Sequence, residues 1–129
     1  IDFTQIKSTS DSKAMISGDA IQLQIAIINV CKNSIEALKG SKTSDPQIKI
    51  SLKEVDNSWI VEIEDNGEGL SPEIISQTLL NSSKPEGTGL GLFIVQSAMD
   101  SHNGNLSLSC SSSGGVIAQL SIPKALQYP

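Results

Sequence analysis

The chain has 129 residues, a net charge of −5 at pH 7 and a hydrophobic fraction of 38%. This length is typical of one domain with its own core, and the hydrophobic fraction excludes a disordered tail. Its nine lysines are scattered and it has no arginine, which argues against a nucleic-acid partner. We expect neither a membrane span nor a signal peptide, because no apolar run approaches the roughly 20 residues that cross a bilayer.

The two cysteines, Cys31 and Cys110, do not form a disulfide framework. Cys31 lies in a strongly apolar stretch that is predicted to be a buried helix. A free thiol behaves there as a small hydrophobic group, so we expect a reducing compartment.

The predicted elements begin with two short edge strands, at about Asp2–Ile6 and Lys13–Ile16. A long helix then runs from about Ile21 to Leu38. Asp19 is a good N-cap for this helix, and Gln22 completes a capping-box pattern.

The rest of the chain alternates between paired strands and helices, without a linker or an internal repeat. The expected elements are strands at Ile48–Val55 and Trp59–Glu64, helices from Ser71 and over Leu90–Ser101, and strands at Leu106–Ser111 and Val116–Ile122. We therefore predict a single α/β domain over residues 1–129. It should be a two-layer sandwich, with a mixed, mostly antiparallel sheet of about five strands covered on one face by three helices.

The long helix carries one polar arc between two apolar stripes. The arc consists of Gln22, Asn29, Asn33 and Glu36, which are separated by nearly whole turns. One of the apolar stripes is Ile21, Ile25, Ile28 and Ile35. A helix that is apolar over two-thirds of its girth is expected to be held between layers. Two buried, unpaired Asn amides would cost about 1–3 kcal/mol each, so they either cap neighbouring backbone or supply oxygen ligands for Mg²⁺.

A second motif, Asp65-Asn66-Gly67-Glu68-Gly69, follows a half-buried strand. A carboxylate at this place can accept a hydrogen bond from an exocyclic amine such as that of adenine. The glycines lack Cβ atoms, so the backbone can lie flat against a ring. The alternative is an ordinary Asp-Asn-Gly turn.

A third motif, Gly87-Thr88-Gly89-Leu90-Gly91-Leu92, precedes the last predicted helix. Unpaired N–H groups and the helix dipole favour anions at such a position, which indicates a phosphate site. A Gly-rich run before a helix is otherwise often only a loop.

In this order, the three motifs resemble the catalytic, ATP-binding domain of a two-component sensor histidine kinase. The wider family includes DNA gyrase and the Hsp90 chaperones. Asn29–Ala37 is similar to the N box of these kinases, Asp65–Gly69 to the first glycine box and Gly87–Leu92 to the second. The resemblance covers nearly the whole chain and implies the Bergerat fold, with ATP and Mg²⁺ as cofactors.

The resemblance also assigns roles to individual residues. Asn33 would be the Mg²⁺ ligand and Asn29 its polar partner one turn earlier, both with catalytic roles. Asp65 would bind adenine beside Gly67 and Gly69. The further residues that the resemblance assigns to ATP are Lys32, Lys84, Gly87, Thr88, Gly89, Leu90, Gly91 and Leu92. For Lys84, an ordinary solvated loop lysine is the alternative.

The sequence departs from the family pattern at two places. The Phe-rich F box is replaced by Leu79-Leu80-Asn81-Ser82-Ser83, where Leu79 or Leu80 would have to take over its packing. Near a weaker third glycine element, Val116 follows Gly114-Gly115, whereas similar kinases often have Thr. This change would remove a hydroxyl near the adenine.

The residue at position 29 distinguishes a kinase from a hydrolase. Similar ATPases have Glu here as the general base that activates water. Asn29 cannot take up a proton at neutral pH, whereas transfer to a neutral imidazole needs no such base. We therefore predict a protein-histidine kinase domain with slow ATP hydrolysis. The alternatives are a gyrase-like ATPase and a pseudokinase that binds nucleotide for regulation.

The phosphoacceptor is expected outside this sequence, because the only histidine, His102, lies in a His-Asn-Gly helix end. The resemblance implies an acceptor on a dimeric helical hairpin upstream of residue 1, and a response regulator as the later partner. It also implies a cytoplasmic domain that is monomeric when isolated and contacts no membrane. Whether the parent protein is anchored in a membrane stays open.

Overall fold

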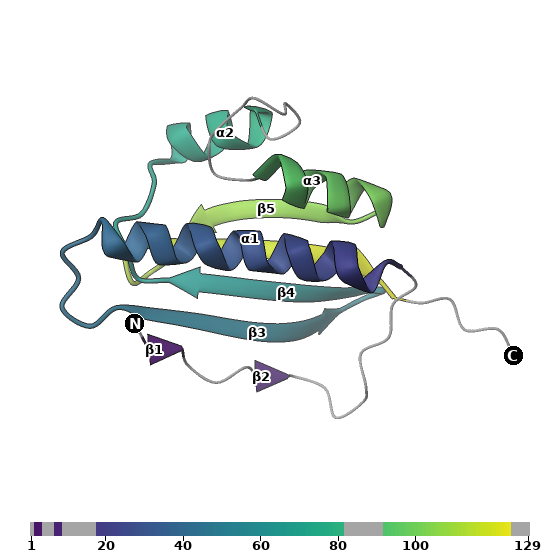
Figure 1. Cartoon of the computed structure of the whole chain (residues 1–129), viewed down its shortest axis with the longest axis horizontal. Helices are drawn as coiled ribbons and strands as arrows, with labels where there is room; N and C mark the ends of the chain where they lie inside the picture. Colours follow the sequence, from purple (N-terminus) through teal and green to yellow (C-terminus); the bar gives the residue numbers. More distant parts are fainter. Residues whose placement is uncertain (1, 4–6, 9–17, 82–91, 125–129) are drawn as a thin grey trace, which may run out of the picture.

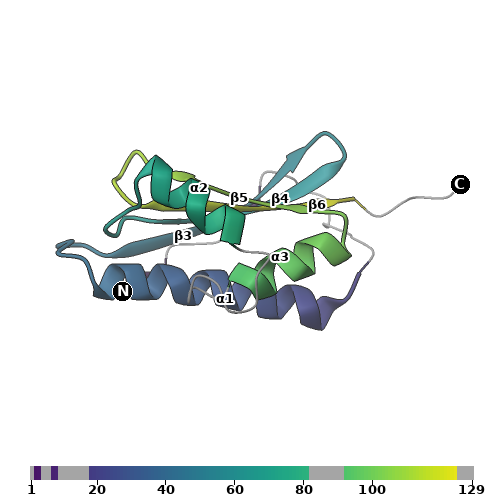
Figure 2. The same ribbon diagram turned by 90° about the horizontal axis from the view of Figure 1, so that it is seen from above.

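The computed structural model describes residues 2–3, 7–8, 18–81 and 92–124. The expected strand at Lys13–Ile16 lies outside these residues. The chain forms two layers, with the helices on one face of a sheet (Figures 1 and 2). The elements are β1 (Asp2–Phe3), β2 (Lys7–Ser8), α1 (Ala20–Lys39), β3 (Gln47–Val55), β4 (Ser58–Asp65), α2 (Pro72–Asn81), α3 (Leu92–Ser101), β5 (Asn105–Cys110) and β6 (Val116–Pro123).

The predicted mixed, mostly antiparallel sheet is confirmed. The strand order is β1-β3-β4-β6-β5, and β2 also pairs with β3. The pairs β3–β4, β4–β6 and β5–β6 are antiparallel, whereas β1 and β2 run parallel to β3. The tight turn between β3 and β4 places Asp56 at a positive φ of 51°, which Asp tolerates better than most residues.

The two faces of the sheet differ in polarity, as the alternation of the strands predicts. On the inner face Ile63 of β4 is fully buried beneath the helices. The outer face carries a chain of polar contacts that crosses four strands. It runs from Lys53 to Glu62 at 2.9 Å, from Gln119 to Glu62 at 2.8 Å and from Ser107 to Gln119 at 3.2 Å.

The start of α1 differs in one respect from the predicted capping box. The Asp19 carboxylate accepts hydrogen bonds from the N–H groups of Ile21 and Gln22, as expected of an N-cap. The Gln22 side chain does not accept a hydrogen bond from the Asp19 N–H, as a capping box requires. It donates instead to the hydroxyl of Ser101 at the end of α3. The Asp19 N–H donates instead to Nε2 of His102, at 2.9 Å. A residue 83 positions away therefore completes the cap.

His102 joins the beginning of α1 to the end of α3. Its Nδ1 lies 2.7 Å from the carbonyl oxygen of Ala98. Because the Asp19 N–H can only donate, Nε2 must be the acceptor and Nδ1 must carry the proton. Gly18 lies against the ring, since a Cβ there would be 2.2 Å from the imidazole Cδ2. The predicted role of His102 at a helix end is confirmed, and Asn103 adopts the left-handed conformation there, with a φ of 55°.

The prediction that α1 is held between two layers is wrong. The side chains of Leu23, Ala26, Val30 and Leu38 are buried against the sheet and α3, but Ile21, Ile25 and Ile28 are exposed. Ile35, the last member of that stripe, is half-buried. Within the described residues, helices cover the sheet on one face only, and no second layer packs on the outer side of α1.

We expect His102→Ala to lower the free energy of unfolding by about 1–3 kcal/mol, because both the part-buried bond from the Asp19 N–H and the buried bond to the Ala98 carbonyl are lost. Urea denaturation at neutral pH measures the change. Gln24→Ala is the control: this side chain is exposed near the same end of α1, and its removal should change stability by less than about 0.5 kcal/mol. Equal stability of the His102 variant and the wild type would contradict the role of His102 in joining α1 to α3.

Candidate functional site

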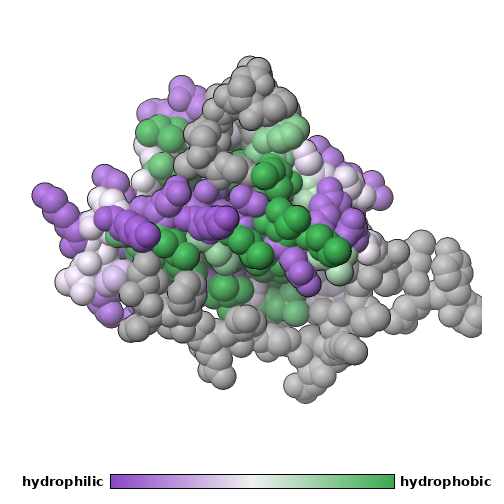
Figure 3. Space-filling view, viewed as in Figure 1, coloured by the Kyte–Doolittle hydropathy of each residue, from purple (hydrophilic) through white to green (hydrophobic). Residues whose placement is uncertain are grey.

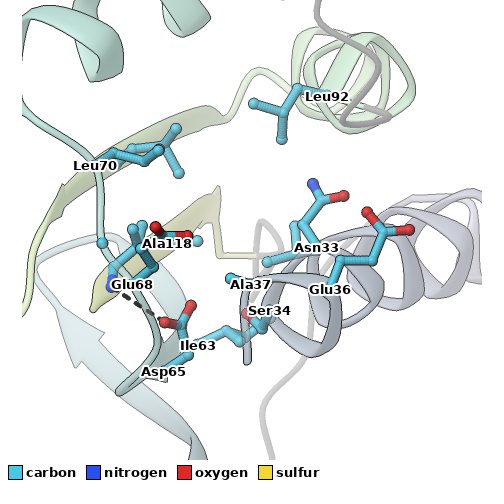
Figure 4. Close-up of a pocket in the computed structure, with 14 residues that line it drawn as sticks. Asn33, Ser34, Glu36, Ala37, Ile63, Asp65, Glu68, Leu70, Leu92 and Ala118 are labelled. Carbon is cyan, nitrogen blue, oxygen red and sulfur yellow. Dashed lines mark hydrogen bonds between the residues drawn. The ribbon is translucent and has the colours of Figure 1, made fainter. Parts of the chain in front are cut away.

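A cavity of about 310 Å³ opens between the second half of α1, the end of β4 and the start of α3 (Figure 4). Its walls are largely apolar and a few polar groups converge on it, which is typical of a site for a small flat ligand. The lining residues are Val30, Asn33, Ser34, Glu36, Ala37, Ile63, Asp65, Glu68, Gly69, Leu70, Leu92, Leu108, Val116 and Ala118.

Asp65 is the buried polar group of this cavity. It ends β4, is only 4% exposed, and points toward the cavity below α1. Its Oδ1 accepts hydrogen bonds from the N–H groups of Gly67, at 2.9 Å, and Val116, at 3.4 Å. The Ser34 hydroxyl of α1 also donates to the carboxylate.

The pKa of Asp65 is raised above its ordinary value of 3.8. Burial is the largest cause, because it disfavours the charged form, and the nearby Glu64 carboxylate acts in the same direction. The hydrogen bonds from Gly67, Val116 and Ser34 oppose the shift without cancelling it. A further donor from a ligand would therefore stabilise the ionised carboxylate.

Two glycines make the close packing around Asp65 sterically feasible. A Cβ on Gly115 would lie 2.0 Å from the carbonyl oxygen of Asp65 and 2.5 Å from its Oδ1. Gly69 has a φ of 78°, and a Cβ on it would lie 2.2 Å from the carbonyl oxygen of Gly114. The first glycine motif and the β5–β6 turn therefore cross in direct backbone contact.

The polar arc predicted on α1 divides into two parts. The side chains of Asn33 and Glu36 line the cavity and lie next to each other in Figure 4. Asn29 is half-buried outside the lining and donates from Nδ2 to the carbonyl oxygen of Ile25 at 2.8 Å. Lys32 is exposed and does not line the cavity either.

The other residues expected at an ATP site have different placements. Gly69 and Leu92 line the cavity, and Gly67 is buried against the carbonyl of Ala37. Leu79 packs against the core, whereas Leu80 is exposed. The expected residues outside the described ranges are Lys84, Gly87, Thr88, Gly89, Leu90 and Gly91.

Sequence reasoning missed two residues that contact Asp65 directly. Ser34 is buried and follows Ala26 and Val30 at spacings of one helical turn, so it lies on the buried side of α1. A hydroxyl on that side needs a hydrogen-bond partner, which could have been predicted from the sequence. Gly115 was interpreted as part of a turn and of a weaker third glycine element, and no local pattern predicts its direct contact with Asp65.

The donor set fits a metal ion that arrives with a nucleotide. Within residues 2–3, 7–8, 18–81 and 92–124, no group of three or more His, Cys, Asp or Glu side chains could hold a metal ion. The Asn33 amide oxygen and the Glu36 carboxylate are hard oxygen ligands on one wall of the cavity. Mg²⁺ is commonly held by one or two protein groups together with phosphates, which matches this pair.

In the part of the chain that the structure describes, no helix has the length and apolar character needed to cross a membrane.

A family model described as histidine kinase-, DNA gyrase B-, and HSP90-like ATPase matches residues 18–126. Sporulation kinase B of Bacillus subtilis is 32% identical over 125 residues, which are 95% of this chain and 28% of that protein. The sensor histidine kinase TmoS of Ectopseudomonas mendocina is 34% identical over 118 residues, 88% of this chain and 12% of that protein. The chain thus spans less than a third of these two relatives.

Solved structures show the same fold. The catalytic domain of the histidine kinase ThkA superimposes with a TM-score of 0.78 at 22% identity, covering 98% of this chain and 81% of that one. The mycobacterial sensor histidine kinase MprB gives a TM-score of 0.76 at 21% identity, covering 98% and 85%. With the family match over residues 18–126, these likenesses show that the chain belongs to the histidine kinase-, DNA gyrase B- and HSP90-like ATPase family and has the fold of a histidine kinase ATP-binding domain.

Proposed function

We propose that this domain binds ATP with Mg²⁺ and transfers the γ-phosphate to a histidine on a separate phosphoacceptor hairpin, in two-component signalling. The observation that carries the proposal is the buried Asp65 carboxylate in an otherwise largely apolar cavity of a histidine kinase fold. Sensor and sporulation kinases among the relatives support the same reaction class.

Asp65 is proposed to recognise the adenine. An exocyclic amine is a hydrogen-bond donor, and a further donor would favour the ionised form of the Asp65 carboxylate, whose pKa burial raises. Apolar side chains such as Ile63, Leu108 and Ala118 would cover the faces of the ring. Guanine presents a carbonyl oxygen in place of that amine, so the carboxylate would disfavour it.

The phosphates are proposed to enter as a metal complex. Glu36, Asp65 and Glu68 line the cavity, and none of the lining residues described is a lysine, arginine or histidine. These carboxylates repel a free polyphosphate. Asn33 and Glu36 would hold Mg²⁺, which neutralises phosphate charge when it is bound. Residues 87–91, outside the described ranges, are the candidates for backbone N–H contacts to the phosphates.

Transfer to histidine is proposed rather than hydrolysis, because a base for water is missing at the expected position. The Asn29 amide cannot accept a proton, and its Nδ2 is hydrogen-bonded within its own helix. A neutral imidazole already has a nucleophilic lone pair, so alignment and charge neutralisation suffice. The competing function is a pseudokinase, which the aromatic-free segment at Leu79–Ser83 favours.

The partners follow from this reaction. The acceptor histidine would lie on a helical hairpin of the parent protein, and a response regulator would receive the phosphoryl group. We propose a cytoplasmic domain that is monomeric when isolated.

Asp65→Asn should remove most of the stabilisation that ADP and Mg²⁺ give to the domain. At about 100-fold excess over Kd, that stabilisation is about 2.7 kcal/mol. Thermal unfolding with and without ADP-Mg²⁺ measures it. Glu68→Gln is the matched control: it also neutralises a carboxylate of the lining, but an exposed one, and it should keep the shift. A full shift in the Asp65 variant would mean that Asp65 is only a turn residue.

The raised pKa of Asp65 also predicts a pH dependence of the unliganded domain. The folded state binds the proton more tightly than the unfolded state. The stability contributed by Asp65 is therefore fully present below pH 3.8 and is lost as the pH rises through the folded-state pKa. Urea denaturation from about pH 4 to neutrality should show the wild type losing stability relative to Asp65→Asn. A relative gain with rising pH would contradict the assignment.

Asn33→Ala should reduce Mg²⁺-dependent phosphotransfer more than nucleotide affinity, because Asp65 and the cavity walls hold the base. Glu36→Gln should weaken the dependence of ADP affinity on Mg²⁺ in the same direction. Isothermal titration with ADP, with and without the metal, separates the two effects. If Asn33→Ala loses metal-free ADP binding equally, Asn33 supports the fold and not the ion.

The isolated domain should turn over ATP very slowly, and should label a histidine when its upstream hairpin is rejoined or added as a separate protein. Radiolabelled γ-phosphate follows both reactions. His102→Ala should leave the labelling intact, because His102 is hydrogen-bonded between the start of α1 and the end of α3 and is not the phosphoacceptor. Rapid phosphate release by the isolated domain would favour an ATPase. Tight ADP binding without transfer to the hairpin would favour the pseudokinase.

A further inference from the structure

Asn66 follows Asp65 at the point where the pairing of β3 with β4 ends. The last paired residues of the two strands are Ile48 and Asp65. A hydrogen-bonded antiparallel pair exchanges two backbone N–H···O=C bonds. Here the Asn66 N–H donates to the Gln47 carbonyl oxygen at 3.3 Å, but the Gln47 N–H donates to the side-chain Oδ1 of Asn66, at 2.8 Å. Because the side chain takes the place of the backbone carbonyl, the main chain can leave the strand directly after Asp65.

The backbone carbonyl of Asn66 is thereby available to the segment that joins α1 to β3. It accepts a hydrogen bond from Thr43 Oγ1 at 2.9 Å. The Asn66 Nδ2 donates to the carbonyl oxygen of Asp45 at 2.8 Å. The backbone N–H and carbonyl of Asn66 and both polar atoms of its side chain are thus all bound to residues 43–47.

These bonds hold the peptide group that joins Asn66 to Gly67. Its carbonyl is the one that Thr43 binds, and its N–H donates to Asp65 Oδ1 at 2.9 Å. A peptide group is planar, so a contact that fixes the carbonyl also sets the direction of the N–H. The segment between α1 and β3 therefore sets the direction of one donor to the Asp65 carboxylate.

We propose that Asn66 is a positioning residue for adenine recognition, because it orients the peptide group whose N–H holds the Asp65 carboxylate. This inference rests on the proposed function, in which that carboxylate accepts the exocyclic amine. The lining of the cavity includes neither Asn66 nor its partners Thr43, Asp45 and Gln47. These residues do not meet a base in the cavity, so they act on it through Asp65.

The test uses Asn66→Ala, which removes both side-chain hydrogen bonds and leaves the Asp65 side chain in place. The matched control is Gln47→Ala. It removes another side-chain amide of the same segment, which donates to the Asp45 carboxylate at 3.0 Å, and leaves the backbone groups that Asn66 binds. Thr43→Val removes the hydrogen bond to the Asn66 carbonyl and keeps the size of the side chain. This second variant serves if Asn66→Ala does not fold.

The first measurement is an NMR titration of the Asp65 carboxyl group in the unliganded domain. Asn66→Ala should raise the pKa of Asp65, and Thr43→Val should raise it less, because the bond from the Gly67 N–H favours the ionised form. Gln47→Ala should match the wild type. The other charged groups around this carboxylate are the same in every variant, namely Lys49 of β3, Glu64 of β4, Glu36 of α1 and Glu68.

The second measurement is isothermal titration with ADP-Mg²⁺ and with GDP-Mg²⁺. Asn66→Ala should bind ADP about tenfold more weakly and GDP nearly as well as the wild type does, so the preference for adenine falls. In an Asp65→Asn background, the same change should not alter this preference further, because Asn66 acts through the carboxylate. Gln47→Ala should keep the preference of the wild type.

An unchanged or lowered pKa of Asp65 in Asn66→Ala would overturn the proposal, as would equal losses of ADP and GDP affinity. Asn66 would then stabilise the turn and nothing more. A wild-type domain that shows no preference for ADP over GDP would instead contradict the proposed role of Asp65 in adenine binding. A raised pKa of Asp65 in Asn66→Ala would still support the positioning of the carboxylate by Asn66 in that case.

Discussion

The Asp65 carboxylate lies where β4, the β5–β6 turn and α1 converge, and it must find hydrogen-bond donors there because water hardly reaches it. The donors are the N–H of Gly67 just after β4, the N–H of Val116 at the start of β6 and the hydroxyl of Ser34 in α1. At the crossing, a Cβ on Gly115 would enter the space of Asp65, and a Cβ on Gly69 would enter that of the Gly114 carbonyl. One buried charge therefore fixes the mutual positions of the segments that form the cavity. Its pKa remains raised, because burial disfavours the charged form more than these hydrogen bonds favour it.

The helix pair α1 and α3 extends this constraint to the end of the cavity where Asn33 lies. At one end, the bond between Asp19 and His102 fixes the start of α1 against the end of α3. At the other end, Asn33 and Leu92 face the same cavity. The two hydrogen bonds of the His102 imidazole stabilise the end of this helix pair that lies away from the cavity. They contribute to the stability of the fold and not to the contacts within the cavity, so their loss should spare phosphotransfer.

Local patterns in the sequence predicted what local forces decide. The strand alternation, the N-cap at Asp19, the helix end at His102 and the carboxylate at Asp65 all follow from short-range periodicity or capping preferences. The contacts that the sequence did not reveal are long-range: Gly115 against Asp65, and His102 in place of Gln22 in the capping box. The error on the exposed residues Ile21, Ile25 and Ile28 of α1 has a different cause (Figure 3). A helix between two layers and a helix that is covered on one side only can have the same apolar periodicity. The arrangement of the described elements distinguishes them, because their helices lie on one face of the sheet.

A largely apolar cavity with one buried carboxylate suits a reaction in which the protein contributes mainly position. Asn29 provides no base, and the reactive lone pair belongs to the acceptor. The domain must then hold the nucleotide with little freedom and present it at a defined place on its surface. Asp65 and the glycine crossing serve the first requirement, whereas only a surface outside the cavity can serve the second. A change at Asn33 should therefore reduce transfer more than nucleotide affinity, because alignment of the two reactants is itself the main catalytic contribution.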